Sequence, residues 1–415
     1  MKLLFLKILA LLGKLFVRRR ALYPPQRLLV IKPDHLGDLL LATPALRTLR
    51  EALPQARIVG LVGPWATHVW ARAPELDRLL VLPFPGFDRS HNKETRRQGE
   101  KGTTYARGMA LMMRLFRSPA LLVFRSALQP YLLLFKYSLL LRSGRYDAAL
   151  LLRDDHWWGA LLALFAGIPV RIGHAYPLSA SFLTTALPLD RSVHVAQQGL
   201  DVVLQIADCR LQVEPQRPQS TIVPLHFAPT SEERAWAKAW LAEQGASAKR
   251  LVVIHPGTGG PAKLWLPARW AAVADELAAR PGTALLITGG PGEEALVEQI
   301  AGLMVQRPLV LAGRASFGQL AALLGQAAVV LGVDSGPLHL AVSQGVPTVT
   351  LFGPVEVGRY GPWGDPAKHQ VVRADIFCSP CHVITACPRG LAVPACMEQI
   401  AVANVLAAAD AVQRT

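Results

Sequence analysis

Short apolar runs alternate with helical stretches along this chain, and this alternation constrains the fold more than any other feature. After residue 230, five runs of five to seven mostly apolar residues are separated by segments with helical spacing of apolar residues. Parallel strands joined by crossover helices produce this pattern. The expected strands are 251–255, 284–290, 308–313, 328–334 and 348–353, and the helices are near 231–244, 267–280, 293–304 and 316–324 and from 337. The second half therefore predicts a doubly wound α/β domain.

The first half shows the same alternation less regularly. A buried strand at 28–31, a helix at 43–53 and a strand at 57–62 form a strand–helix–strand unit, which implies another parallel sheet. The further elements expected here are strands near 79–82 and 148–152 and a helix near 159–166.

A Pro-rich stretch around 213–229 separates the two halves and is typical of a linker. We predict an N-terminal helix at 1–22, Rossmann-like domains at 23–215 and 230–400, a linker at 216–229 and a C-terminal helix at 401–415.

Positive charge is concentrated in two segments. Of the formal net charge of +15, residues 1–20 supply +6 and residues 86–146 supply +9, with twelve Lys or Arg against three acids. In both segments the cations are interleaved with Leu, Phe and Met. This pattern favours an anionic lipid surface. It argues against a nucleic-acid partner, because basic patches for nucleic acid usually have polar or stacking aromatic surroundings.

The N-terminal segment, MKLLFLKILALLGKLFVRRR, has the pattern of an amphipathic helix. Lys7, Gly13 and Lys14 interrupt its apolar run, whereas a membrane span needs ~20 apolar residues. Lys7, Lys14 and Arg18 share one face on a helical projection. We expect a helix that anchors the chain at a membrane surface. A helix packed on the protein itself and an uncleaved signal or short span are the alternatives.

A second apolar and basic segment, 107–142, follows a polar and charged stretch at 86–105. Four of its cations lie close together on a helical projection: Arg107, Arg114, Arg125 and Lys136. Pro119 and Pro130 are expected to break or kink such a helix. We interpret about 86–145 as an insertion of one or more amphipathic helices into the first domain. An ordinary buried helical pair is the alternative.

Cysteine is sparse, with Cys209 alone and four cysteines near the C-terminus: Cys378, Cys381, Cys387 and Cys396. Secreted disulfide frameworks are denser, which favours the cytoplasm. The gaps within the group of four do not follow a regular zinc-ribbon spacing. Buried thiols, a structural zinc site and disulfides therefore all stay open.

Open α/β sheets bind ligands at the carboxyl ends of their strands, so functional residues are expected in the strand-to-helix loops. The first-domain loop, KPDHLGDLLLATPAL at 32–46, has Gly37 at its turn and Asp38 at the helix entrance. A carboxylate at that position can be an N-cap or a catalytic base.

Two loops of the second domain carry further candidates. HPGTGGPAKLWLPARW, at 255–270, combines three glycines with Lys263. Glycine-rich backbone beside a lysine suits a phosphate, although this is not a Walker A motif. The loop GGPGEE, at 289–294, contains Glu293. Its side chain can bond ribose hydroxyls or serve as a first-turn acid that the helix dipole favours.

The segment VDSGPLHLAVSQGVPTVTLFGP, at 333–354, is the most informative. Asp334 and Ser335 end a strand, Gly336 allows a tight turn, and the following proline suits the first turn of a helix. Free backbone N–H groups at such a helix start form an anion site. His339 lies in the first turn, where a structural role and a functional role are both open.

Taken together, GDLLLATPAL, HPGTGGPAKLW, GGPGEE and VDSGPLHLAVSQGVPTVTLFGP resemble glycosyltransferase family 9, the ADP-heptose:lipopolysaccharide heptosyltransferases. Their order and spacing match from about Arg27 to Ala408. The resemblance implies the GT-B fold, with two Rossmann-like domains facing a cleft. It also implies an inverting sugar transfer that needs no cofactor and no active-site metal.

The resemblance further implies a role for each candidate. Asp38 is the expected general base on the acceptor hydroxyl. Lys263 and the helix start at Ser335–Gly336 are expected to stabilise charge that grows on the diphosphate. His339 would assist at the phosphates, and Glu293 would hold the ribose. The residues expected to bind the nucleotide sugar are Thr258, Gly259, Lys263, Glu293, Asp334, Ser335, Gly336 and His339.

The expected function is transfer of a heptose from ADP-heptose to a lipid-linked lipopolysaccharide-core acceptor. The expected partners are that donor or another nucleotide sugar, the lipid-linked saccharide acceptor and, through 1–20 and 107–142, the inner membrane surface. The expected location is cytoplasmic, peripheral on the inner face of the bacterial inner membrane. One alternative is a family-9-like transferase that uses another nucleotide sugar for O-antigen or another envelope glycan. The other is a non-catalytic, membrane-bound nucleotide-sugar binding protein.

Overall fold

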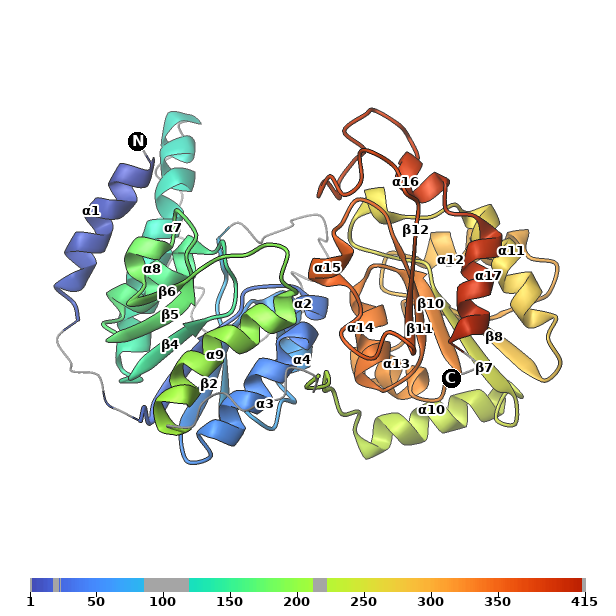
Figure 1. Ribbon diagram of the computed structural model, residues 1–415, viewed down its shortest axis with the longest axis horizontal. Coiled ribbons are helices and arrows are strands. Elements are labelled where there is room, and N and C mark those ends of the chain that lie inside the picture. Colours follow the sequence, from blue (N-terminus) through green and yellow to red (C-terminus); the bar gives the residue numbers. More distant parts are fainter. Residues whose placement is uncertain (1, 18–21, 23, 86–118, 212–221, 413–415) are drawn as a thin grey trace. The chain divides into compact units, whose positions relative to one another are not determined.

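The computed structural model describes residues 2–17, 22, 24–85, 119–211 and 222–412 (Figure 1). By their contacts these residues form two compact units. The first unit takes the described residues of Met1–Asp34, Leu53–Thr67 and Leu76–Leu189, and the second takes those of His35–Ala52, His68–Glu75 and Asp190–Thr415. Each unit contains one six-stranded sheet. The domain boundaries at 23–215 and 230–400 stay predictions.

The first unit is built on a parallel sheet with the strand order β3-β2-β1-β4-β5-β6. Its strands are β1 (Arg27–Ile31), β2 (Arg57–Val62), β3 (Arg78–Val81), β4 (Ala148–Leu151), β5 (Val170–His174) and β6 (Thr185–Leu187). In this register Val30 lies opposite both Gly60 and Leu150. The strand order reverses between β1 and β4, so their carboxyl ends form the switch point at which such sheets bind ligands.

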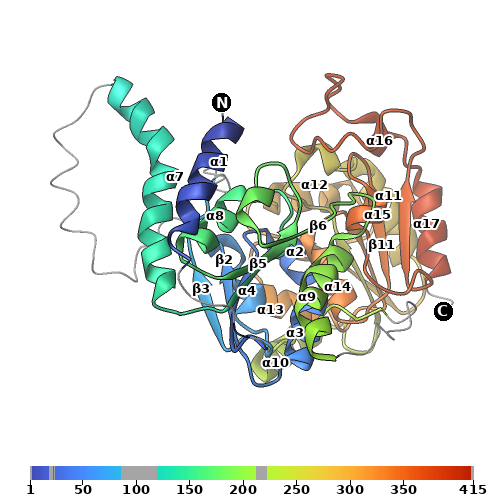
Figure 2. The ribbon, with the colours of Figure 1, turned by 60° about the vertical axis from the view of Figure 1, so that its left-hand side comes forward.

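Three helices of this unit bury apolar residues in one cluster with the sheet: α1 (Lys2–Lys14), α7 (Pro119–Arg142) and α8 (Trp157–Phe165). Both α1 and α7 pack against α8 (Figure 2). Leu6 and Ala10 bury one face of α1. A Cβ atom on Gly13 would lie 2.5 Å from the Leu164 Cδ2, so the close approach of α1 to α8 requires glycine there. Helix α1 is therefore packed on the protein along one face.

Helix α7 is the described end of the predicted insertion. It begins at Pro119 and continues through Pro130, so a break at Pro130 does not occur. The Trp158 Nε1 donates to the Pro130 carbonyl oxygen at 2.8 Å, which ties the middle of α7 to α8. Leu132 and Phe135 are exposed, so this part is not an ordinary buried helix. Residues 86–118, with Arg107 and Arg114, lie outside the described residues.

No helix within the described residues is both long enough and apolar enough to cross a bilayer.

The second unit repeats the same topology. Its parallel sheet has the order β12-β11-β10-β7-β8-β9. When the strands of each sheet are numbered along the chain from its own first strand, both sheets have the same strand order. Its strands are β7 (Arg250–His255), β8 (Thr283–Gly289), β9 (Leu309–Ala312), β10 (Val329–Val333), β11 (Thr348–Phe352) and β12 (His369–Arg373). The switch point therefore lies between β7 and β10.

Helices cover both faces of this sheet, with α11, α12 and α17 on one face and α13 and α14 on the other (Figure 1). The remaining helices are α2 (Leu36–Leu41), α3 (Thr43–Ala52), α4 (Thr67–Trp70), α9 (Val195–Leu211), α10 (Ser231–Glu243), α11 (Pro267–Ala278), α12 (Glu294–Leu303), α13 (Phe317–Leu324), α14 (Gly336–Ser343), α15 (Val357–Tyr360), α16 (Ala395–Glu398) and α17 (Val402–Ala411). Capping boxes fix the starts of α10, through Thr230 and Glu233, and of α13. The core under α11 contains Trp265 and Trp270, whose rings meet edge to face at 4.9 Å.

The strands and helices expected from 231 to 353 form within a residue or two of their predicted bounds, whereas the helix predicted at 401–415 ends at Ala411. Strands β5, β6 and β12 and helices α2, α4, α9, α15 and α16 were not expected. The segment that contains α2 was interpreted as loop, and the structure corrects this interpretation.

Candidate active site

The loops after β7 and β10 meet at the switch point of the second sheet. The Lys263 Nζ donates to the Asp334 carbonyl oxygen at 2.7 Å and lies 3.0 Å from the Asp334 Oδ2. The Thr258 hydroxyl donates to the same carbonyl oxygen at 3.3 Å. The Lys263 side chain is largely buried, at 13% exposure. Three of the predicted residues are thus brought together, with a cation fixed at the end of β10.

Helix α14 begins directly beyond this contact. Ser335 is its N-cap in extended conformation, but the side chain makes no capping hydrogen bond. The Ser335 Oγ is buried and has no hydrogen-bond partner in the described part of the chain. At this start Pro337 has no N–H and the Leu338 N–H donates to the Ser335 carbonyl oxygen at 3.2 Å, so the backbone N–H groups of Ser335 and Gly336 are the ones available to an anion.

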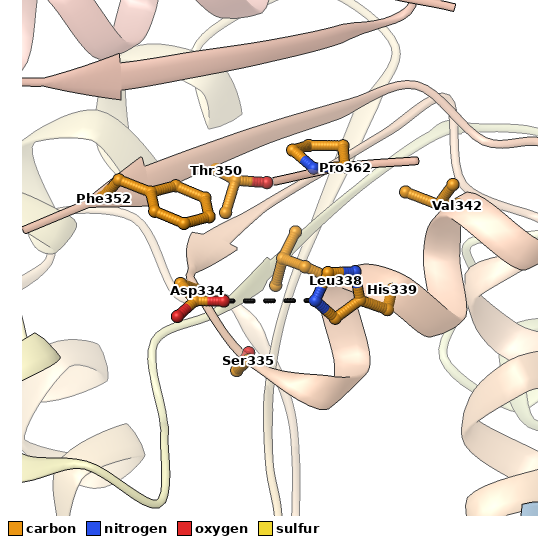
Figure 3. A pocket seen from close by; sticks show the side chains of 8 residues that line it. All are labelled: Asp334, Ser335, Leu338, His339, Val342, Thr350, Phe352 and Pro362. Atoms are coloured by element: carbon orange, nitrogen blue, oxygen red, sulfur yellow. Dashed lines mark ion pairs between the residues drawn. The ribbon is translucent and has the colours of Figure 1, made fainter. Parts of the chain in front are cut away.

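His339 lines an open pocket of about 180 Å³ together with Asp334, Ser335 and Thr350 (Figure 3). The His339 Nε2 lies 4.0 Å from the Asp334 Oδ1. Burial lowers the pKa of His339 to about 4, and the neighbouring Asp334 offsets only part of that effect. The imidazole is therefore neutral near pH 7. It can donate a hydrogen bond to a phosphate but adds no charge.

Glu293 lies at the N-cap of α12, one residue before the first turn in which it was expected. Its Oε2 accepts from the Gly290 N–H at 2.7 Å and lies 3.5 Å from the His255 Nε2. A Cβ atom on Gly257 would lie 2.1 Å from the Glu293 carboxyl carbon, so glycine there leaves room for the carboxyl group. Glu293 therefore faces the loop after β7. Its role toward a ribose stays a prediction.

Asp38 is the third residue of α2, and the N-cap of this helix is His35. The N-cap interpretation of Asp38 is therefore wrong, although its carboxyl group still lies in the first turn. A Cβ atom on Gly37 would lie 3.2 Å from the His339 Cδ2 and 3.3 Å from the Gly336 Cα. The backbone just before Asp38 thus lies against the start of α14, where the diphosphate is expected. The catalytic role of Asp38 stays a prediction.

A charged cluster at the switch point of the first sheet was missed by the sequence analysis. The Lys32 Nζ lies 3.0 Å from the Asp34 Oδ2, and the Arg153 guanidinium also contacts Asp34. Burial alone would raise the pKa of Asp34, but attraction to Lys32 and Arg153 outweighs burial and lowers it to about 2. The sequence does contain a signal for this cluster, because the charged residues of KPD directly follow a buried strand.

His255, the last residue of β7, was also missed. It is buried, its Nδ1 lies 3.0 Å from the Thr288 Oγ1, and its Nε2 faces Glu293. Burial lowers the pKa of His255. A histidine that ends an otherwise apolar strand, as in LVVIH, was the available signal.

The four C-terminal cysteines are free thiols that line one open pocket of about 430 Å³ with Ala262 and Pro354. Cys396 is buried, and the other three are partly exposed. In the portion of the chain that the structure describes, no three His, Cys, Asp or Glu side chains are grouped so that they could hold a metal ion.

Two parallel sheets with the same order, each with charged residues at its switch point, define an α/β protein of the two-Rossmann class. The sequence profile of glycosyltransferase family 9 (heptosyltransferase) matches residues 135–389, more than half of the chain. The chain belongs to glycosyltransferase family 9, which confirms the resemblance found in its motifs.

Individual proteins agree with this assignment. The chain is 26% identical over 337 residues to lipopolysaccharide heptosyltransferase 3 of Escherichia coli, covering 79% of this chain and 84% of that protein. A family 9 glycosyltransferase from Veillonella parvula has a similar structure, with a TM-score of 0.70 and 24% identity over 94% of this chain and 97% of that one. The ADP-heptose lipopolysaccharide heptosyltransferase II of E. coli has a TM-score of 0.65 and 20% identity, over 94% and 98% of the two chains. These structures confirm the GT-B fold.

Proposed function

We propose that this protein transfers a heptose from ADP-heptose to a hydroxyl group of a lipid-linked lipopolysaccharide-core acceptor. The observation that carries the proposal is the convergence of Thr258, Lys263 and Asp334 beside the start of α14, in a member of this family. A lysine next to free helix N–H groups is suited to a diphosphate.

In the proposed reaction the carboxylate of Asp38 accepts the proton of the acceptor hydroxyl. The acceptor oxygen then forms a bond to the anomeric carbon, and the bond between that carbon and the diphosphate oxygen breaks. The bonding electrons leave with ADP. Attack from the opposite side inverts the configuration of the sugar.

The charge that grows on the leaving diphosphate is stabilised by Lys263 and by the N–H groups at Ser335–Gly336. The neutral His339 donates a hydrogen bond to the same group. Thr258 and Gly259 shape the loop around it, and Glu293 holds the ribose.

We place the enzyme peripherally on the inner face of the inner membrane, where a lipid-linked acceptor is found. In this proposal segments 1–20 and 107–142 contact the membrane surface. The exposed apolar residues of α1 and of the described part of α7 support it.

The test is incubation of the full chain with ADP-heptose and either Kdo-lipid A or its heptosylated form. We expect release of ADP and a mass gain of one heptose on the acceptor. Release of ADP without a mass gain would show that the heptose is transferred to water, and the supplied saccharide would then be excluded as the acceptor. Transfer only from a different nucleotide sugar would show that ADP-heptose is not the donor. Binding of ADP without any turnover would favour a non-catalytic nucleotide-sugar binding protein.

A further inference from the structure

Helix α1 carries apolar side chains on its outer face as well as on its buried face. Leu6 and Ala10 are buried in the core of the first unit. On the other side Ile8 is exposed and Leu11 is 66% exposed, and Leu15, in the turn directly after α1, is 70% exposed. Exposed leucines at this spacing form a second apolar stripe, which the packing on α8 does not explain.

Helix α7 shows the same arrangement. Leu134 and Leu141 are buried against the core. Leu132, Phe135 and Leu139 are spaced by three and four residues, and all three are exposed. A soluble helix with one buried face normally places polar residues at such positions.

The two helices are held together as one surface. The rings of Phe5 and Tyr131 meet edge to face at 5.6 Å. The Arg142 guanidinium donates to the Phe16 carbonyl oxygen at 3.2 Å and lies 5.1 Å from the centre of the Phe16 ring. Both views show α1 beside α7 (Figures 1 and 2). We call the outward side chains of Ile8, Leu11, Leu15, Leu132, Phe135 and Leu139 the α1–α7 face.

The charge at this face has one sign. Lys7, Lys14, Lys136 and Arg142 are exposed, and neither helix contains an acidic residue. A second copy of the chain would bring the same cations together, which opposes self-association. Lysine is also depleted in protein–protein interfaces. Apolar side chains rimmed by cations are the features of an interfacial, anionic-lipid-binding surface.

We propose that the α1–α7 face docks on a bilayer rich in anionic phospholipid. Its apolar side chains enter the boundary between headgroups and acyl chains, and its lysines contact the headgroups. This inference deepens the peripheral location proposed above and rests on it. It does not depend on the identity of the donor sugar. Because α1 packs against α8 and contacts α7, it forms a single membrane-binding surface together with α7 and is not a separate membrane anchor.

Co-sedimentation of the full chain with vesicles tests the apolar part of the face. The vesicles contain phosphatidylcholine with or without phosphatidylglycerol. Leu11→Glu and Leu139→Glu should each lower the partition coefficient on phosphatidylglycerol vesicles about tenfold or more. Leu303→Glu, in α12 of the other unit, is the matched control because Leu139 and Leu303 are both 51% exposed. Unchanged thermal unfolding would show that the variants fold, and equal losses in variants and control would overturn the proposal.

Lysine variants test the electrostatic part. Replacing Lys7, Lys14 and Lys136 by Gln should weaken binding to phosphatidylglycerol vesicles about fivefold per lysine. The same change at the exposed Lys238 and Lys249 of the second unit should have no effect. Equal binding of the wild-type chain to neutral and anionic vesicles would contradict the proposed lipid.

Two further measurements distinguish a failure of the proposed membrane contact from a failure of the proposed function. A wild-type dimer that Leu11→Glu dissociates, without vesicle binding, would assign the face to a second copy. Turnover on a delipidated, soluble acceptor should be unchanged in the face variants. If the wild-type chain binds vesicles as expected but transfers no sugar to any acceptor, the proposed function fails and the docking face stands.

Discussion

At the scale of single residues, the contact between Lys263 and Asp334 determines what the second switch point can bind. The lysine is held at the end of β10 by both a carbonyl and a carboxyl oxygen. A cation fixed in this way needs no reorganisation when charge develops on a bound diphosphate. The same contact also ties the loop after β7 to the start of α14.

Replacing Lys263 by Ala should lower kcat/KM for the sugar donor by about 10²–10³, because one preorganised donor to the leaving group is lost. Lys263→Arg should recover part of that loss. The measurement is steady-state kinetics of ADP release, with Lys238→Ala as the control on an exposed helix face. Wild-type kinetics in Lys263→Ala would restrict this lysine to a structural role.

At the scale of elements, the success of sequence reasoning depends on how completely each strand is buried. Strands β7, β8, β10 and β11 are continuous apolar runs between helices, so their positions follow from the pattern. Strand β5 was missed because its sequence, VRIGH, carries the buried Arg171. The Arg171 guanidinium is satisfied by the carbonyl oxygens of Phe182 and Ile168, a pairing that no periodicity reveals.

Helix α2 was missed for a different reason. It has six residues, too few for a period of 3.6 to be recognised. Its position depends on tertiary contact, since the backbone of Gly37 lies against Gly336 and His339 of α14. The place of Asp38 shortly after β1 was predictable, whereas its position inside a short helix was not.

Gly332→Ala should destabilise the second unit by about 1–3 kcal/mol. A Cβ atom there would lie 2.5 Å from the His255 carbonyl oxygen, which belongs to the backbone of the neighbouring strand and cannot turn away. Gly302→Ala is the control, because no atom lies within 4 Å of the added Cβ and alanine is favoured in a helix. Chemical denaturation measures both variants. Equal stability of Gly332→Ala and the wild type would contradict the packing of β10 against β7.

At the scale of the whole molecule, the candidate site was only partly predictable. The residues of the second unit lie in loops at the ends of recognisable strands, so topology alone points to them. The pairing of Asp34 with Arg153 joins residues 119 positions apart, and only the folded sheet brings them together. Contacts of this kind are absent from the local pattern that sequence reasoning uses.

Both units should lose stability as the pH falls from 7 to 5. Burial lowers the pKa of His156 in the first unit and of His339 in the second to about 4. In the unfolded chain a histidine titrates near pH 6.5, so between pH 6.5 and 4 the unfolded state binds more protons and stability falls with pH. Each histidine should contribute about 2 kcal/mol to this loss between pH 7 and 5.

Urea denaturation at pH 7 and pH 5 measures the effect. His156→Phe and His339→Phe should each flatten the pH dependence, whatever their effect on stability at pH 7. Asp34, whose pKa is lowered to about 2, also contributes to stability. That contribution is lost only below pH 3.8, the ordinary pKa of an aspartate, and therefore outside the range from pH 7 to 5. A stability that does not change between pH 7 and 5 would contradict the neutral, buried state of both histidines.

The central claim is that the second switch point binds the nucleotide sugar while Asp38, beside the start of α14, removes the acceptor proton. The most direct measurement compares kcat and the ADP-heptose Kd in wild type and Asp38→Asn. We predict that kcat falls by about 10²–10⁴ while Kd changes less than about twofold, because a base acts in the transition state and not in donor binding. A parallel loss of turnover and donor affinity would contradict this account and make Asp38 a structural residue of α2.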